Sequence, residues 1–473
     1  FSWGAGVYVT KAQVVGSPNI MQKGISSAVS QWKLQIGATV GSIDTDAKPA
    51  AGLTEQLAQI AGLPVKLSLG ANRPEDCAAA DLIFVSQGVP LDLPPLQAAR
   101  ERHTPLGSAT QLFMERCVAP ITGVTGSAGK TTTTSLLGAM FEAAGRRVHV
   151  GGNIGVVLLD RLDTITSDDW VVLEISHTQL ELTDRSPHIA LVTNISPSHA
   201  DRYPVMDDYI ALKRRIYEFQ SSRDFLVLNW DNPATREMGP AAVARTVFFS
   251  MTSSLPGEGA SIAKGQVMVG WQGATHAVMP VASIPLMGDH NKANVLAACA
   301  AATAAGVPFE TQRRAVEDFR GVEHRLEWVR ALNQVDYYND SIATTPERTI
   351  AGLRCFDRPV VLLAGGREKH LPLDGWTSEV AAHCRAVVCF GEAGPLLQRA
   401  LEQDAGTPNH VYHAELLEAV VAAAGFARPG DIVLLSPACT SFDRYPNFEA
   451  RGRHFKALVN HLTEELHPKR RTS

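Results

Sequence analysis

The sequence predicts an α/β protein of three domains, and three observations support this prediction. The chain has 473 residues, enough for about three domains of ordinary size, each with its own core. Short apolar segments alternate with helical ones, as in parallel sheets that helices cover on both faces. A glycine-rich turn near residue 126 links one such strand to a helix. We expect a Rossmann-like domain at 1–117, a central P-loop ATPase-type parallel sheet at 118–312, and a Rossmann-like domain at 313–473.

The N-terminal domain is predicted from short α/β units. Strands are expected at 39–44 and 81–86, with a helix at 55–61. The first glycine turn, at Gly16, lacks the G-x-G-x-x-G pattern, and Pro18 follows where a helix should begin. We therefore give dinucleotide binding little weight here.

The central domain has longer apolar strands, expected at 170–175, 189–194 and 225–229. Their near-continuous apolar character predicts a parallel sheet that is buried on both faces. The stretch 245–270, with its Gly and Ser turns, predicts a short antiparallel appendage. A helix from Asp289 to Gly306 precedes Pro308 and marks the exit from the domain.

The last domain repeats this pattern with strands at 359–364, 386–390 and 431–435. Each strand is followed by polar or glycine-rich residues. Ligands bind beyond the carboxyl ends of the strands in open parallel sheets, so both later domains are expected to present ligand-binding loops.

The composition is that of a soluble globular enzyme, with 45% hydrophobic and 19% charged residues. We expect no membrane span and, from the N-terminal residues, no secretory signal. Seven cysteines without a C-x-x-C pair favour free thiols in the cytoplasm over disulfides or a zinc site. A net charge of −5 gives no general attraction to nucleic acid or to an anionic membrane.

The most informative segment runs from 121 to 133, Ile-Thr-Gly-Val-Thr-Gly-Ser-Ala-Gly-Lys-Thr-Thr-Thr. Gly126 and Gly129 allow the backbone to turn its amides toward phosphate oxygens. Lys130 supplies a cation, and Thr131 offers a hydroxyl to Mg²⁺. The first glycine of the usual pattern is replaced by Val124, so an ordinary glycine-rich turn is the alternative.

Two residues at strand ends are candidate metal ligands. Glu174 ends an apolar strand, where such folds place a carboxylate near Mg²⁺, although acids also end strands simply by facing solvent. His199 follows the next strand in a loop, and it is either a ligand in the same sheet or an exposed histidine.

Lys213 lies in the middle of the apolar face of a predicted helix, within about 60° of Tyr209, Ile210, Ile216 and Tyr217. Burial favours the neutral amine, which can react with carbon dioxide to give a carbamate, an acidic oxygen ligand for Mg²⁺. The alternative is a lysine that buries only its stem and extends its amine to solvent.

Several weaker candidates follow in the sequence. Asn291 and Asn294 share one face at the start of a helix, where they either cap it or meet a base. Cations and hydroxyls that could hold the carboxylates of an acidic amino acid occur at Arg325, Asn339-Asp340-Ser341, Lys369 and 436–441.

Taken in order, these motifs resemble those of the Mur ligases of peptidoglycan synthesis. Within that family they are most similar to the members that add glutamate to UDP-N-acetylmuramoyl-L-alanine. The resemblance spans about 81–455 and rests on the phosphate loop and on the segments 151–155, 174–176, 198–204, 213–218, 288–291, 324–325, 339–341 and 435–439.

The resemblance implies an N-terminal UDP-binding domain, a central ATP-binding domain and a C-terminal amino-acid-binding domain. ATP and Mg²⁺ would activate the substrate's carboxylate as an acyl phosphate, which the glutamate amine then attacks. The expected partners are UDP-N-acetylmuramoyl-L-alanine and glutamate, without nucleic acid or membrane, and the protein is expected to be a cytoplasmic monomer.

The resemblance also assigns roles to residues. The catalytic set would be Lys130, Glu174, His199 and carbamylated Lys213, with Thr131, Glu174, His199 and Lys213 around the metal. The nucleotide would contact Gly126, Ser127, Gly129, Lys130, Thr131, Thr132, Asn291, Asn294, Arg325 (the γ-phosphate) and Asp340 (the ribose). Asn153, Ser176 and Gln179 would bind the muramoyl substrate, and Thr344, Lys369, Ser441 and Phe448 would bind glutamate.

Alternatives remain at this stage. The segments Ser176-His177-Thr178-Gln179 and Asn339-Asp340-Ser341-Ile342 depart from the common pattern of the D-glutamate-adding members, so an L-glutamate-adding ligase is possible. A folylpolyglutamate synthetase shares the phosphate loop and the carbamylated lysine but fits the other motifs poorly. A nucleotide switch without turnover would not need Glu174, His199 and Lys213 together.

Overall fold

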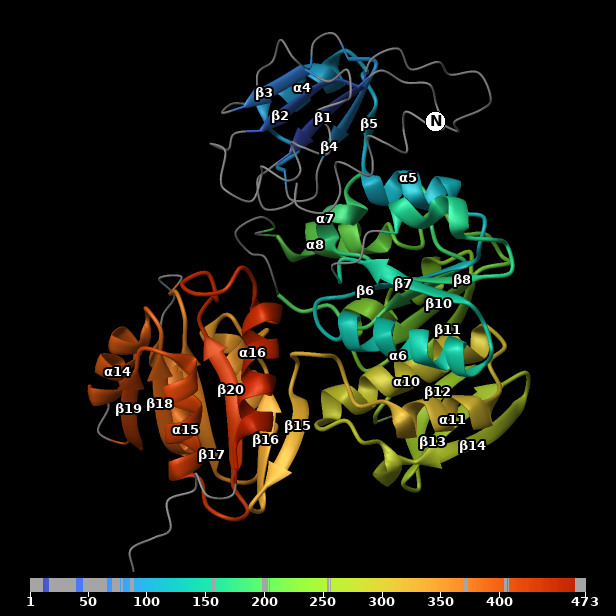
Figure 1. Cartoon of the computed structure of the whole chain (residues 1–473). Helices are drawn as coiled ribbons and strands as arrows, with labels where there is room; N and C mark the ends of the chain where they lie inside the picture. The colour runs from blue at the N-terminus through green and yellow to red at the C-terminus, as the bar shows by residue number, and fades with distance from the viewer. Residues whose placement is uncertain are drawn as a thin grey trace, which may run out of the picture. The chain divides into compact units, whose positions relative to one another are not determined.

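A computed structural model of the chain describes residues 12–16, 40–45, 66–69, 77, 80–85, 89–154, 158–197, 203, 205–252, 255, 257–368, 373–403, 406 and 408–463. Its chain contacts define two compact units. Unit 1 comprises Phe1–Pro285 and Asp289–Phe319, and unit 2 comprises Leu286–Gly288 and Arg320–Ser473. The predicted domains 1–117 and 118–312 both fall in unit 1. The predicted α/β class is confirmed, with helices and mainly parallel sheets in both units (Figure 1).

The N-terminal sheet has the strand order β3-β2-β1-β4-β5, and all its pairs are parallel. This order is that of a Rossmann half-sheet with two further strands. The strands predicted at 39–44 and 81–86 correspond to β2 and β4, whereas the helix predicted at 55–61 lies outside the described residues. The elements are β1 (Ala12–Gly16), β2 (Val40–Thr45), β3 (Lys66–Leu69), β4 (Leu82–Val85), α4 (Pro94–Glu101), β5 (Leu106–Gly107) and α5 (Ala109–Arg116).

The central sheet has nine strands in the order β14-β13-β12-β11-β10-β9-β6-β8-β7. Its strands are β6 (Ile121–Thr125), β7 (Val148–Gly152), β8 (Trp170–Glu174), β9 (Ile189–Val192), β10 (Phe225–Asn229), β11 (Arg245–Ser250), β12 (Gly259–Ala263), β13 (Gln266–Trp271) and β14 (Ala274–Pro280). Neighbouring strands are parallel from β7 to β12.

The antiparallel appendage predicted for 245–270 is therefore only partly correct. β11 pairs in parallel with β10 and extends the main sheet, and the antiparallel part is β12 to β14. The chain between β10 and β11 forms the short helix α9 (Pro233–Arg236) and a 3-10 turn, which bring β11 back in the parallel direction. Turns at Gly265 and Gly273 join the antiparallel strands, and the first of them lies in the stretch for which the sequence predicted turns.

Helices complete the central domain: α6 (Lys130–Ala143), α7 (His177–Leu180), α8 (Met206–Arg214), α10 (Asp289–Ala304) and α11 (Phe309–Asp318), with 3-10 turns η1 (Leu159–Thr164), η2 (Gly239–Ala241) and η3 (Val281–Ser283). α6 and α10 pack against each other and against the sheet (Figure 1). A separate apolar cluster joins alternate residues of β8, β9 and β10 to α5, η1 and α8. The strands are thus apolar on both faces, as their sequences predicted.

Unit 2 contains a six-stranded sheet in the order β15-β16-β20-β17-β18-β19, in which β15 alone is antiparallel to its neighbour. Its elements are β15 (Glu327–Leu332), β16 (Val335–Asn339), α12 (Pro346–Leu353), β17 (Val360–Gly365), α13 (Asp374–His383), β18 (Cys384–Phe390), α14 (Gly394–Glu402), β19 (Asn409–His413), α15 (Leu416–Phe426), β20 (Ile432–Ala438) and α16 (Phe448–His461). The strands predicted at 359–364, 386–390 and 431–435 are confirmed as β17, β18 and β20.

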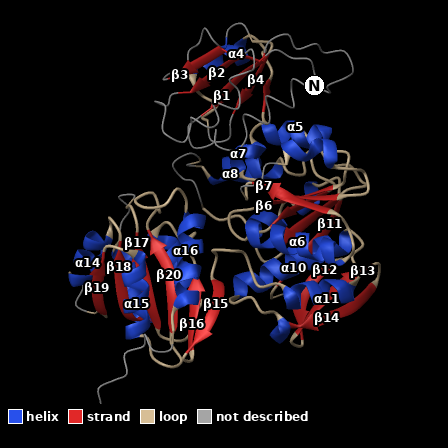
Figure 2. Ribbon diagram, viewed as in Figure 1, coloured by secondary structure: helices blue, strands red, loops and turns tan. Residues whose placement is uncertain are grey.

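Two apolar clusters cover the two faces of this sheet. Figure 2 shows α15 and α16 beside its strands. Val361 and Leu363 of β17 face α15 and α16, and Val360 and Leu362 of the same strand face α12, α13 and α14. The period of two places successive side chains on opposite faces, so a strand buried on both sides must be apolar throughout. Among the described residues of both units, no helix has the length and apolar character needed to cross a membrane.

Candidate functional site

The glycine-rich turn lies between β6 and α6, as the sequence predicted. Gly126 has φ of 147°, and a Cβ placed there would lie 2.0 Å from Thr193 Oγ1. Gly129 has φ of 82°, and a Cβ there would lie 2.3 Å from Asn294 Oδ1. At both positions the backbone conformation and the close neighbours exclude any side chain. This requirement for glycine at two positions favours a phosphate loop over an ordinary glycine-rich turn.

The first half of the turn is held by Asn194, just beyond β9. Ser127 N donates to the Asn194 carbonyl at 2.9 Å, and Ala128 N donates to Asn194 Oδ1 at 3.0 Å. The first hydrogen bond of α6 runs from Thr133 N to the carbonyl of Gly129. The amides of the first helical turn, rather than those of Ser127 and Ala128, are therefore the backbone groups that can bind an anion.

The predicted loop side chains have different settings. Lys130 Nζ donates to the carbonyls of Gly126, at 2.9 Å, and Ser127, at 3.1 Å, so its amine lies over the turn. Thr131 is partly exposed, whereas Thr132 is buried. Ser127 Oγ donates to the carbonyl of Ser196 at 3.1 Å and accepts from its amide at 3.0 Å, which fastens the turn to the chain after β9.

Glu174 is buried at the end of β8, which excludes the interpretation as a solvent-facing acid. Its Oε1 accepts a hydrogen bond from Asn153 Nδ2 at 2.7 Å, and Asn153 N donates to the Glu174 carbonyl. Its Oε2 is buried and, among the described residues, has no hydrogen-bond partner. A carboxylate oxygen that is shielded from solvent and not hydrogen-bonded is costly, and a cation would satisfy it.

Lys213 is 1% exposed, and its amine does not reach solvent. Nζ donates to Thr125 Oγ1 at 2.9 Å and lies 5.3 Å from the centre of the Tyr209 ring. Burial, reinforced by the charge of Lys130 and opposed by that of Glu174, holds the pKa of Lys213 well below its usual value of 10.5. The helical periodicity thus predicted the burial of this residue correctly, and the alternative of a solvent-reaching amine is wrong.

Thr125 was not among the predicted site residues, yet it connects them. Its Oγ1 donates to the carbonyl of Ile175 at 2.7 Å and accepts from Lys213. It therefore joins the end of β6 to the end of β8 and to α8. A threonine at the end of an apolar strand gives no sequence signal for this role.

The chain after β8 carries two further predicted residues. Ser176 and Gln179 form a capping box at the start of α7, in which Ser176 N donates to Gln179 Oε1 at 2.8 Å and Gln179 N to Ser176 Oγ at 3.3 Å. Gln179 Nε2 donates to Thr110 Oγ1 at 2.9 Å. Both side chains are buried at this edge of the sheet, close in sequence to Glu174.

Asn291 and Asn294 lie in the first turns of α10. Asn294 Nδ2 donates to Asn291 Oδ1 at 3.1 Å, and Asn294 Oδ1 lies against Gly129. The pair therefore links the start of α10 to the phosphate loop. The contact of these two asparagines with adenine remains a prediction.

His199, the other predicted metal ligand after a strand of the central sheet, lies outside the described residues.

In unit 2, Arg325 lies in the chain segment just before β15. Its neighbours His324 and Leu326 both have left-handed backbone, with φ of 66° and 42°. Each such non-glycine residue costs on the order of 1–3 kcal/mol and persists only where its surroundings hold it.

Asp340 follows β16 and is buried, with both carboxyl oxygens engaged. Oδ2 accepts from Ser436 Oγ at 2.8 Å and Oδ1 from Leu326 N at 3.2 Å. Burial raises its pKa to about 7, opposed by these hydrogen bonds and by the charges of Arg325 and Arg348. Both carboxyl oxygens of Asp340 thus accept hydrogen bonds from the protein. The contact of Asp340 with the ribose remains a prediction.

Arg451 on α16 is a residue that sequence reasoning missed. Its guanidinium is fully buried and donates to the carbonyls of Ser341, Gly365, Cys439 and Thr440 and to Ser341 Oγ. It thereby fixes the chain at the ends of β16, β17 and β20. Burial lowers its pKa to about 10, so it stays charged at neutral pH.

The predicted amino-acid-binding residues lie near this arginine. Ser441 is buried directly after the Cys439-Thr440 segment, and the carbonyl of Phe448 accepts from Ser341 Oγ at 2.8 Å. Thr344 is partly buried beyond β16. Lys369 lies outside the described residues. In each unit, some of the described site candidates, such as Glu174 and Asp340, lie at the carboxyl ends of parallel strands.

The fold and the loop between β6 and α6 define a P-loop α/β protein with a buried acid and a buried amine beside the loop. Two family models match the chain, the Mur ligase middle domain at 124–302 and the Mur ligase glutamate ligase domain at 324–439. A relative from Symbiobacterium thermophilum named UDP-N-acetylmuramoylalanine--D-glutamate ligase is 42% identical over 442 residues, covering 93% of this chain and 97% of the relative. One of the same name from Acetivibrio thermocellus is 40% identical over 87% of this chain and 89% of its own.

Solved structures agree on the fold. MurF from Acinetobacter baumannii matches with a TM-score of 0.57 and 16% identity over 94% of this chain and 92% of its own. UDP-N-acetylmuramate-alanine ligase MurC from Thermotoga maritima matches with a TM-score of 0.55 and 18% identity over 96% and 99%. The chain belongs to the Mur ligase family, whose members are ATP-dependent amide-bond ligases.

We expect Gly129→Ala to weaken binding of ATP by at least about tenfold, because the new methyl group would meet Asn294 Oδ1 at the phosphate loop. Gly145→Ala is the matched control. Gly145 also has a positive φ, of 77°, but a Cβ there meets nothing within 4 Å. Calorimetric titration of each variant with ATP checks the prediction. If the two variants lose ATP affinity equally, the contact with Asn294 does not explain the effect of Gly129→Ala.

Proposed function

We propose that this chain is a ligase that adds D-glutamate to UDP-N-acetylmuramoyl-L-alanine, with ATP as the source of energy. The proposal is carried by the similarity to relatives of that name over nearly the whole of both chains. The buried groups beside the phosphate loop support the chemistry. The substrate carboxylate attacks the γ-phosphorus of ATP and releases ADP, and the glutamate amine then attacks the acyl phosphate, forming the amide and releasing phosphate.

The phosphate loop would hold the nucleotide. The amides of the first turn of α6 and the Lys130 amine present positive charge to the phosphates, and the Lys130 side chain must turn from its loop carbonyls to do so. Thr131 and Glu174 would hold Mg²⁺. The buried Oε2 of Glu174, which lacks a hydrogen-bond partner in the described chain, fits this role. When bound, the ion offsets charge on the phosphoryl oxygens during transfer.

Lys213 would contribute as a carbamate, together with His199, on the side of the site toward the acyl phosphate. The low pKa of its buried amine supports this, since only the neutral amine reacts with carbon dioxide. The reaction joins the amine nitrogen to the carbon of CO₂ and releases one proton. The resulting anion would lie near Thr125 and the Lys130 charge, which offset the cost of burying it.

The remaining site residues are proposed to bind the organic parts of the substrates. Asn153 contacts Glu174, and Ser176 and Gln179 follow it in the chain after β8, where the muramoyl-alanine carboxylate would meet ATP. In unit 2, Thr344, Lys369, Ser441 and Phe448 would hold glutamate and Arg325 the γ-phosphate. Asn291 and Asn294 would contact adenine and Asp340 the ribose.

The test of this function is phosphate release from ATP with each substrate omitted in turn. We expect turnover only when UDP-N-acetylmuramoyl-L-alanine and D-glutamate are both present, because attack by the amine completes the cycle. Equal ATPase activity without either substrate would contradict the ligase proposal. Turnover with L-glutamate but not with D-glutamate would instead assign the chain to an L-glutamate-adding ligase.

A second prediction concerns Lys213. We expect Lys213→Ala to lower kcat by about 10²-fold or more, because a buried anion is lost beside the reacting phosphoryl group. Acetate or formate should partly restore activity by occupying the space of the carbamate. Arg214→Ala is the control, because this neighbour is exposed and should retain full activity. Full activity of Lys213→Ala would remove this residue from the mechanism.

A further inference from the structure

The segment that carries Arg325 is held at every successive amide. His324 N donates to Glu327 Oε2 at 2.9 Å, Arg325 N to the carbonyl of Val322 at 3.1 Å, and Leu326 N to Asp340 Oδ1 at 3.2 Å. The left-handed backbone on both sides of Arg325 is maintained by these bonds. Such constrained, unfavourable backbone is concentrated at sites where a side chain must be aimed.

The Glu327 carboxylate connects the segment to two neighbouring side chains, Asn339 and Lys456. Its Oε2 accepts from His324 N and from Asn339 Nδ2, both at 2.9 Å, and its Oε1 accepts from Lys456 Nζ at 2.8 Å. Lys456 Nζ also donates to Glu323 Oε1 at 2.7 Å. The carboxylates of Glu323 and Glu327 are thus joined through one ammonium group, with Arg325 between them in the sequence.

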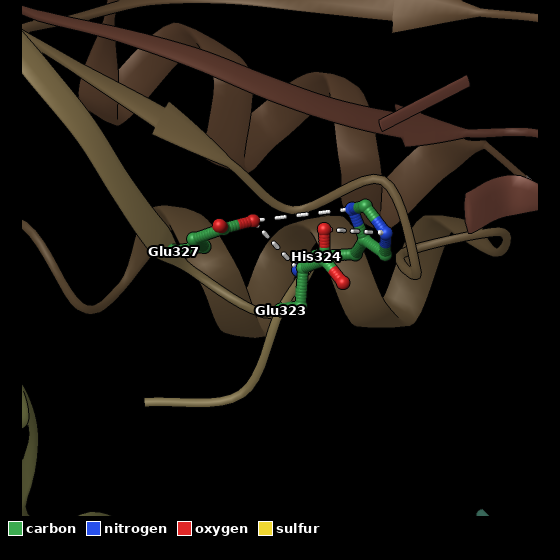
Figure 3. Close-up of side chains that lie close together, drawn as sticks. All are labelled: Glu323, His324 and Glu327. Carbon is green, nitrogen blue, oxygen red and sulfur yellow. Dashed lines mark hydrogen bonds and ion pairs between the residues drawn. The ribbon is translucent and has the colours of Figure 1, made fainter. Parts of the chain in front are cut away.

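His324 completes the arrangement from inside the unit. Burial lowers its pKa, so the neutral ring accepts from Asn339 Nδ2 at Nδ1, at 2.8 Å. Its Nε2 lies 3.6 Å from Glu323 Oε1 (Figure 3). His324 and Glu327 therefore both use the Asn339 amide at the end of β16, which ties the segment to the sheet.

The same side chains resemble a set of metal ligands, because ligand atoms of Glu323, His324 and Glu327 lie within 4.8 Å of one another. Lys456 already supplies the positive charge, with its ammonium within 2.8 Å of an oxygen of each glutamate. A cation would have to displace that ammonium. The arrangement is therefore an ion-paired clamp on the segment.

We propose that Glu327 and Lys456 are positioning residues that hold Arg325 in place for the γ-phosphate of ATP. This inference rests on the proposed function, in which Arg325 contacts that phosphate. Neither residue needs to touch the nucleotide. Loss of the clamp should therefore weaken binding of ATP and leave binding of ADP, which lacks the γ-phosphate, nearly unchanged.

The test measures the affinity of the full chain for a non-hydrolysable ATP analogue and for ADP, both with Mg²⁺, by calorimetry. Glu327→Gln and Lys456→Met should each bind the ATP analogue about tenfold more weakly, with ADP affinity changed by less than about twofold. Lys456→Arg, which keeps the ion pairs, should bind like the unaltered chain. Glu379→Gln is the matched control, since Glu379 is an ion-paired glutamate of unit 2 that is 20% exposed, against 19% for Glu327.

A double-variant cycle shows whether the clamp acts through Arg325. In the Arg325→Ala background, Glu327→Gln should cause no further loss of ATP-analogue affinity. If Glu327→Gln weakens the two nucleotides equally, or still acts when Arg325 is absent, the inference is overturned. If Arg325→Ala itself leaves the ATP analogue unaffected, the failure lies in the proposed role of Arg325. Should Glu327→Gln not fold, the Lys456 pair of variants gives the same decision.

Discussion

The burial of the Lys213 amine against Thr125 is the interaction on which the central site depends. Thr125 is the last residue of β6, so its hydroxyl fixes the point where the phosphate loop begins. That hydroxyl donates to the strand end beside Glu174 and accepts from Lys213 on α8. One short side chain therefore sets the relation between the loop, the buried acid and the buried amine. An amine held there loses its proton more readily because solvation of its charge is lost.

Unit 2 also contains a fully buried basic side chain, that of Arg451. Arg451 is as deeply buried as Lys213, but its guanidinium donates to four backbone carbonyls and a hydroxyl at the strand ends. Five donors in a planar group can satisfy that many acceptors, and a guanidinium keeps its proton even when burial lowers its pKa to about 10. The arginine therefore serves as a fixed structural cation, whereas the lysine is suited to a change of protonation state.

Sequence patterns were informative where the constraint is local. The phosphate loop was recognisable because two glycines, a lysine and the flanking strand and helix lie within a few residues of one another. The burial of Lys213 followed from helical periodicity alone. The sequence did not predict the parallel pairing of β11 with β10. The direction of a strand depends on the path of the chain that precedes it, and a turn-rich composition does not indicate that path.

The supporting residues were not predictable for a similar reason. Lys456 contacts Glu327 across a separation of 129 residues, and Arg451 contacts Ser341 across 110. Neither basic residue differs in type or spacing from an ordinary residue of an amphipathic helix. Only the fold brings them to the carboxyl ends of the strands.

A pH titration of the Lys213 side chain tests the central claim most directly. The measurement is the ¹³Cε signal of labelled lysine in buffer depleted of carbon dioxide, assigned by its loss in Lys213→Arg. The account predicts that this amine titrates well below the usual lysine pKa of 10.5, because burial disfavours its charged form. A Lys213 signal that titrates at the usual lysine pKa of 10.5 would contradict it.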